Sequence, residues 1–408
     1  MKPVNVDARR DDRVDTGPGR RPTALVEAVE AGGYARPEMD VATFCRQSRV
    51  LIVAGKGGVG KTTITASLAR LAARAGLDVL VVELEGKPGV PAAFGGSGPL
   101  GYHESPLAEN GGTRAATPGW GRIAPPGPGG AGRAGTATDS GRLRARRITP
   151  DDALLEYLAD HGMGRISKRL VSSGALDVVA TAIPGIRDIL VLGKIKQLER
   201  EAEVDLILVD APATGHAMTF LSSARGLLDA ARSGPVRAQA ADVVELLTDP
   251  ERCQVALVTL PEEMPVNEVI EAAYQLEDKV GITLGPVIVN ACLPQVSWAA
   301  LDAAAAAREA GVSLSDDQAR ALQAASSFRD QRFRLQQHYR RRLADELPLA
   351  QLAAPLVFAP TIGPEEIARI AAGLAAEIER LGGQGAGPLP HDAPSPGAGH
   401  PTAATGPG

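Results

Sequence analysis

The chain has 408 residues, enough for one large α/β domain or two smaller domains with a sizeable core. Its residues are 44% hydrophobic but only 3% aromatic, so Ala, Val, Leu and Ile must build that core. A net charge of −5 gives no overall attraction to nucleic acid or to an anionic membrane. Because neither a run of about 18 apolar residues nor a signal-peptide pattern is present, we expect a soluble cytoplasmic protein without direct membrane insertion.

Three stretches have the composition of disordered segments. Residues 1–46 are polar and charged and are predicted to be a flexible tail, with one short helical pattern near 23–30. Residues 109–147 are rich in Gly, Pro, Ala and Arg, and we expect a disordered insertion whose basic end is either solvated or in contact with an acidic partner. Residues 382–408 form a similar tail. The folded domain is therefore predicted to span 47–381.

Between these stretches, short apolar runs alternate with helical patterns. Six runs dominated by Val, Ile and Leu are predicted to be buried strands: Val50–Ala54, Val79–Leu84, Leu206–Asp210, Val255–Leu260, Pro286–Asn290 and Leu356–Ala359. They lack the polar–apolar alternation of a half-exposed strand, which is typical of a parallel sheet covered on both faces. The predicted fold is α/β, with a doubly wound, mostly parallel sheet.

Two longer helical regions, about 149–201 and 296–346, predict a helical subdomain. The first begins at Thr149-Pro150-Asp151-Asp152, where a Thr cap, a first-turn Pro and two acids favour a helix N-terminus. The second contains a helix starting at Ser315, with Gln318 at capping-box spacing. The apolar stripe of that helix fits either a core contact or a groove for a client.

The most specific motif is a glycine-rich loop that follows the first strand. It reads Gly55-Lys56-Gly57-Gly58-Val59-Gly60-Lys61-Thr62-Thr63, and its first eight residues satisfy G-x-x-x-x-G-K-[ST]. The glycines let successive N–H groups point at phosphate oxygens, and the helix that follows presents its positive end to the same anion. Lys61 is predicted to reach the β- and γ-phosphates, and the Thr62 hydroxyl to bind Mg²⁺. The alternative is a turn with no ligand.

A carboxylate that shares the metal with Thr62 is predicted at the end of another strand. Val204-Asp205-Leu206-Ile207-Leu208-Val209-Asp210 is an apolar run with an acid at its carboxyl end, where ligands bind in sheets of this kind. We expect Asp210 to hold Mg²⁺ through a water molecule. The alternative is a strand-end acid with no metal.

The loop resembles the "deviant" P-loop of a set of dimeric ATPases. The set includes the arsenical pump-driving and tail-anchored-protein-targeting ATPases, the nitrogenase iron protein, and the partition and septum-placing ATPases. The resemblance implies that the extra lysine, Lys56, reaches across a dimer interface to the ATP of the partner, unless it is merely solvated. Residues 210–216, Asp-Ala-Pro-Ala-Thr-Gly-His, are similar to the D-T-A-P-T-G-H switch of the arsenical-pump and tail-anchored-targeting branch, with the A-P pair displaced by one position. In that switch His216 has either a structural or a moving role.

The family's water-positioning residue is an Asp just after the second strand, and Glu85 stands at that position here. Glu83-Leu84-Glu85 also fits the D-x-D spacing of the partition ATPases, with both acids lengthened. The extra methylene of Glu85 displaces its carboxylate by about 1 Å, enough to cost on the order of a hundredfold in rate. The resemblance thus implies a catalytic set of Lys56, Lys61 and Glu85, with turnover that is slow or lost.

Recognition of the base is predicted by the same resemblance. Val287-Ile288-Val289-Asn290 looks like the family strand whose Asn binds the adenine edge, although Asn290 also fits a strand-terminating role. The segment 260–268, Leu-Pro-Glu-Glu-Met-Pro-Val-Asn-Glu, resembles a family segment near the nucleotide, and Pro360 would close over the base.

Two functions are compatible with these motifs. The first is an ATPase that couples closure of a dimer to a client or a membrane transporter; with one P-loop, the chain needs a copy of itself or a paralogous subunit. The alternative is a nucleotide-dependent binding switch with little or no hydrolysis. Cys45, Cys253 and Cys292 are too scattered for the arsenite, zinc or iron–sulfur sites of some family members.

Overall fold

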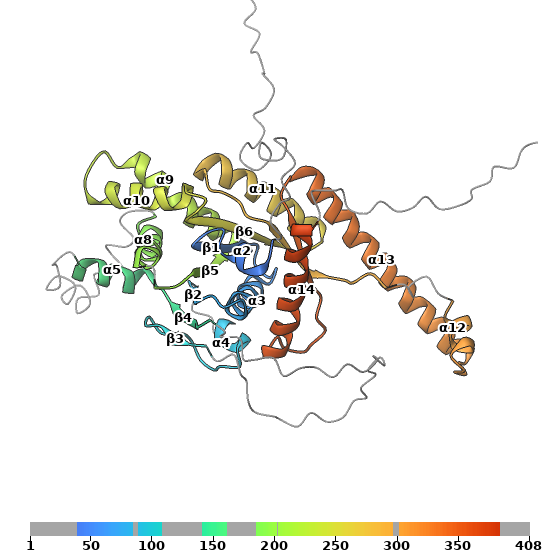
Figure 1. The fold of residues 1–408 in the computed structure, drawn as a ribbon. Helices are drawn as coiled ribbons and strands as arrows, with labels where there is room; N and C mark the ends of the chain where they lie inside the picture. The colour runs from blue at the N-terminus through green and yellow to red at the C-terminus, as the bar shows by residue number, and fades with distance from the viewer. Residues whose placement is uncertain are drawn as a thin grey trace, which may run out of the picture. The chain divides into compact units, whose positions relative to one another are not determined.

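The computed structural model describes residues 39–84, 89–107, 141–160, 185–201, 203–296 and 302–383. Within these ranges the chain forms an eight-stranded sheet with helices on both faces (Figure 1). The strands are β1 (Val50–Gly55), β2 (Val79–Glu83), β3 (Ser105–Pro106), β4 (Leu143–Arg147), β5 (Leu206–Ala213), β6 (Cys253–Thr259), β7 (Val287–Cys292) and β8 (Gln351–Pro355). Their order in the sheet is β3-β4-β2-β5-β1-β6-β7-β8, and each pair is parallel except β3 with β4. The predicted α/β fold with a mostly parallel sheet is confirmed.

The helices divide between the two faces of this sheet. One face is covered by α8 (Ile186–Glu201), α9 (Thr214–Ala230), α10 (Pro235–Thr248) and α11 (Glu263–Val280), and α5 (Pro150–Asp160) packs on α8. The other is covered by α2 (Val41–Cys45), α3 (Lys61–Arg74), α4 (Gly89–Ala93) and α14 (Pro364–Gly383). The long helix α13 (Asp316–Glu346) packs on α11 and on α12 (Ala303–Glu309).

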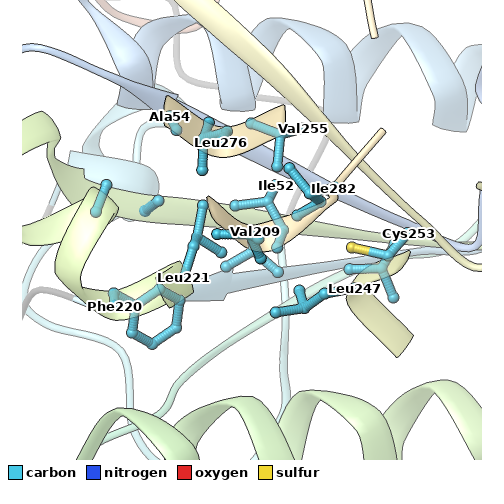
Figure 2. Close-up of a cluster of buried hydrophobic side chains, with 14 of the residues drawn as sticks. Ile52, Ala54, Val209, Phe220, Leu221, Leu247, Cys253, Val255, Leu276 and Ile282 are labelled. Atoms are coloured by element: carbon cyan, nitrogen blue, oxygen red, sulfur yellow. The ribbon is translucent and has the colours of Figure 1, made fainter. Parts of the chain in front are cut away.

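Alternate side chains of each central strand enter opposite cores, as the two-residue period of a strand requires. In β1, Ile52 and Ala54 belong to the cluster under α8–α11, whereas Leu51 and Val53 belong to the cluster under α3 and α14. Figure 2 shows part of the first cluster, which joins strand residues to side chains from α9, α10 and α11: Ile52, Val209, Val255, Phe220, Leu221, Leu247 and Leu276. Because both faces are covered, the central strands β1, β2, β5, β6 and β7 are apolar over most of their length, and this explains their missing polar–apolar alternation.

The predicted disordered insertion is wrong at its carboxyl end. Residues 143–147 form β4, which pairs in parallel with β2 and buries Leu143 and Ala145. Arg144 forms an ion pair with Glu104, and the guanidinium of Arg146 stacks over the Tyr102 ring at 4.7 Å. The arginines bury their stems while their charged groups find partners, so a strand lies inside a basic stretch. Residues 109–140 of the predicted insertion lie outside the described residues.

The end of the predicted N-terminal tail and the last strand also need correction. Residues 41–45 form the short helix α2, which Asp40 caps through the Thr43 N–H at 2.7 Å and which buries Phe44. The last strand is Gln351–Pro355 rather than 356–359. Leu352 is fully buried and pairs with β7, whereas Phe358 is exposed. The strand therefore begins five residues before the apolar run that was used to predict it.

The helical regions follow the predicted starts. A hydrogen bond of 3.2 Å from the Asp152 N–H to the Thr149 hydroxyl caps α5, and the reciprocal capping box of Ser315 and Gln318 opens α13. Residues 161–184 lie outside the described ranges, as do 23–30. No helix in the described part of the chain is long and apolar enough to cross a membrane.

Candidate nucleotide-binding site

The glycine-rich loop leaves β1 at the edge of the sheet where the parallel strands end, and it enters α3 at Gly60. Gly60 is the N-cap of α3 in the left-handed conformation (φ 91°), which favours glycine. A Cβ on Gly60 would overlap the Asn290 side-chain amide, and one on Gly55 would overlap the Val258 carbonyl oxygen. The neighbouring strands β6 and β7 therefore hold the loop tightly. Among the described residues no side chain caps α3 at Gly60, so the first N–H groups of this helix are available to an anion.

The residues predicted to bind phosphate and metal lie together at the start of α3. The Lys61 ammonium donates to the Lys56 carbonyl oxygen at 3.2 Å, which folds the lysine back over the loop. The Thr62 hydroxyl donates to Asp210 Oδ2 at 2.7 Å, and the Thr65 hydroxyl lies 3.4 Å from Asp210 Oδ1. The Asp210 side chain is buried, with the residue 8% exposed. The structure thus joins the P-loop helix to β5 through the two groups expected to share Mg²⁺.

Glu83, which the sequence matched only to the first acid of the D-x-D spacing, is the residue of this site that was assigned no role. It ends β2, in register with Asp210 of β5, and is only 2% exposed. Burial raises the pKa of its carboxyl to about 7, and the charge of Asp210 adds to the rise. The Val90 N–H and Arg147 favour the charged form, yet neither oxygen has a hydrogen bond of normal geometry within the described part of the chain. An acid ending a Val-rich strand was the available signal.

The extra lysine of the loop is engaged within the chain. The Lys56 ammonium forms an ion pair with the Glu268 carboxylate of α11, and the two side chains are 42% and 32% exposed. Glu268 ends the 260–268 segment that was predicted to lie near the nucleotide. The structure therefore places this segment against the loop, and Lys56 is not a freely solvated side chain.

Two residues predicted to bind the base lie in different surroundings. The Asn290 amide donates to the Val59 carbonyl at 2.8 Å, while its oxygen accepts from the Ala291 N–H at 2.8 Å. Asn290 thus supports the back of the loop, and its contact with adenine stays a prediction. Pro360 is exposed in the segment between β8 and α14, and its contact with the base also stays a prediction. Glu85 and the His216 side chain lie outside what the structure describes.

The donor set suits Mg²⁺, which prefers oxygen ligands and retains several waters. The Thr62 hydroxyl and the Asp210 carboxylate are hydrogen-bonded, and the neighbouring carboxylate of Glu83 accepts no hydrogen bond of normal geometry in the described ranges. Cys45, Cys253 and Cys292 are free and buried, so they serve as small core side chains.

Comparison with known families matches two models to this chain. Residues 50–231 match the CobQ/CobB/MinD/ParA nucleotide binding domain, and residues 230–313 match the anion-transporting ATPase. The ATPase BagA of Mycobacterium tuberculosis is 35% identical over 253 residues, which cover 60% of this chain and 66% of that protein. The putative arsenical pump-driving ATPase of Halobacterium salinarum is 28% identical over 61% of this chain and 36% of its own length.

A more distant relative is the ATPase GET3 of Chaetomium globosum, 25% identical over 49% of each chain. The chain spans just under two thirds of BagA and smaller fractions of the other two relatives. Both matched models and the P-loop geometry agree with one another. The chain is therefore similar to the MinD/ParA group of nucleotide-binding domains over residues 50–231 and to the anion-transporting ATPases over residues 230–313.

Proposed function

We propose that the chain binds ATP with Mg²⁺ and hydrolyses it. The observation that carries this proposal is the Thr62–Asp210 hydrogen bond of 2.7 Å, which joins the P-loop helix to β5. The loop amides and Lys61 would hold the phosphates, and Thr62 and Asp210 would hold the metal. Held there, Mg²⁺ would neutralise the phosphate charge that develops during transfer of the γ-phosphoryl group.

Hydrolysis also needs a group that orients the attacking water, and we assign this role to Glu85. A second function is favoured by the same residue, since Glu stands where the family has Asp. If the longer side chain misplaces the water, the protein is a nucleotide-operated binding switch with little turnover. Single-turnover hydrolysis separates the two functions. A Glu85→Ala variant that hydrolyses ATP as fast as the wild type would exclude Glu85 as the catalytic group.

The proposed working form is a dimer, either of two copies or with a paralogous subunit. Lys56 supports this proposal, because the loop needs one lysine for its own nucleotide and Lys61 supplies it. In the ATP-bound dimer Lys56 would leave Glu268 and contact the nucleotide of the partner subunit. Opening after hydrolysis would release a client or a membrane transporter, and the proposed place of action is the cytoplasm.

Calorimetric titration with ATP tests the binding step. Wild-type protein is expected to bind ATP in the micromolar range with Mg²⁺, and Lys61→Ala is expected to weaken binding at least tenfold. Lys279→Ala, on the far turn of α11, is the matched lysine control. Equal affinities of the wild type and Lys61→Ala would contradict the proposed site.

A further inference from the structure

Glu83 is a buried carboxylate that the ATPase proposal leaves without a role. The residue is 2% exposed, and neither of its oxygens accepts a hydrogen bond of normal geometry within the described part of the chain, although the nearby Val90 N–H favours the charged form. Burying a carboxylate without a partner is costly, and proteins usually satisfy such groups with hydrogen bonds or cations. The structure therefore leaves acceptor capacity for a positively charged or hydrogen-bonding ligand at this position.

The surroundings of Glu83 are those of the proposed metal site. Glu83, the last residue of β2, is the register partner of Asp210 in the adjacent parallel strand β5, and adjacent strands lie about 4.8 Å apart in such sheets. Gly89, which follows β2 in the chain, lies against Thr62 at the start of α3. A Cβ added to Gly89 would lie 2.8 Å from Thr62 Cγ2. Glu83 thus lies beside Asp210 of β5 and close to the Gly89–Val90 segment, which contacts Thr62.

Two carboxylates in this arrangement repel each other, and a cation between them removes the repulsion. Arg147 is the register partner of Glu83 on the opposite side, in β4, and its charge favours the Glu83 carboxylate without hydrogen-bonding it. The Glu83 carboxylate oxygens therefore remain able to accept hydrogen bonds on the side next to Asp210. Mg²⁺ fits this position, since it keeps several waters and binds through one or two carboxylates and the phosphates.

We infer that Glu83 is a second carboxylate of the magnesium site, which accepts hydrogen bonds from water ligands of the ion alongside Asp210. The inference rests on the proposed function, since it needs a magnesium nucleotide in the P-loop. It assigns Glu83 a positioning role, distinct from the attack on phosphorus assigned to the water at Glu85. Because Glu83 would act on the metal, its loss should weaken metal binding and spare the affinity for the nucleotide alone.

Calorimetric titration with ADP, with Mg²⁺ and with a chelator, tests this role without turnover. The wild type is expected to bind ADP more tightly with Mg²⁺. In Glu83→Gln the increase in ADP affinity on adding Mg²⁺ is expected to be about tenfold smaller than in the wild type. The variant should keep the wild-type affinity for metal-free ADP, which also shows that it is folded. Mn²⁺ bound with ADP gives an independent readout by electron paramagnetic resonance, and the variant should require about tenfold more Mn²⁺ for saturation.

Glu277→Gln is the matched control: Glu277 lies in the last turn of α11, away from the proposed metal site, and this variant should leave the magnesium-dependent gain in ADP affinity and the Mn²⁺ saturation unchanged. A Glu83→Gln variant with the full wild-type gain from Mg²⁺ would overturn the inference. If that variant does not fold, Glu83→Asp decides instead, since it keeps the charge but moves it by one methylene; an undiminished gain would again overturn the inference. Failure of the wild type to bind ADP in either condition would instead contradict the proposed function.

Discussion

Replacing Glu268 by Gln should make the proposed dimer form more readily. In the structure Glu268 holds the Lys56 ammonium within its own chain, and that contact must break before Lys56 can reach a partner's nucleotide. The two side chains are 42% and 32% exposed, so the ion pair contributes about 0.2–1 kcal/mol. Two such pairs break for each dimer, which corresponds to a dimer dissociation constant about twofold to thirtyfold lower in the variant.

Sedimentation velocity over a range of protein concentrations, with a slowly hydrolysed ATP analogue and Mg²⁺, measures this constant. The difference should shrink at high salt, because partly exposed pairs are screened. Glu271→Gln is the matched control: it removes one charge from the same helix, where Glu271 accepts only from Gln275 at 2.8 Å among the contacts described. In a Lys56→Ala background, Glu268→Gln should have no effect. A weaker or unchanged dimer in the single variant would refute the reasoning.

Three further results are expected. Folding raises the pKa of Glu83 and thereby favours its protonated form, so the metal-free wild type should lose up to about 3 kcal/mol of unfolding free energy as pH rises from 4.5 through about 7. In urea unfolding, Glu83→Gln should lack this decline. A difference in unfolding free energy between the two proteins that stays constant across that pH range would refute the prediction. Gly55→Ala should abolish ATP binding because its Cβ meets the Val258 carbonyl. Gly58→Ala, also at positive φ but in open space, should cost only about 1–2 kcal/mol of stability. Equal losses of ATP affinity in the two variants would contradict the packing at Gly55. Asn290→Ala should destabilise the loop by about 1 kcal/mol and raise the Kd for ATP severalfold in calorimetry.

The phosphate site could be predicted because its chemistry is local in sequence. Glycines at fixed spacing, a lysine and a threonine between a strand and a helix define the loop, and an acid at the end of an apolar strand supplies Asp210. The structure adds their contact, the Thr62–Asp210 hydrogen bond. The central strands were predictable for the same reason, since each is a short apolar run.

The features that escaped prediction depend on residues far apart in the sequence. Strand β4 was hidden because its arginines find partners, such as Glu104, only in the folded chain. The pairing of Lys56 with Glu268 joins residues separated by 212 positions, so no local pattern indicates it. The burial of Glu83 beside Asp210 follows from the strand order, in which β5 lies next to β2.

The proposed nucleotide-dependent dimer is tested by the molar mass of the purified chain with Mg·ATP and with Mg·ADP. The account predicts that a slowly hydrolysed ATP analogue doubles the mass from the 42.2 kDa of one chain, and that ADP returns it to one chain. Lys56→Ala should stay at one chain in both conditions while still binding ATP. A wild-type protein that binds ATP and remains monomeric, alone and with any paralogous subunit, would contradict the account.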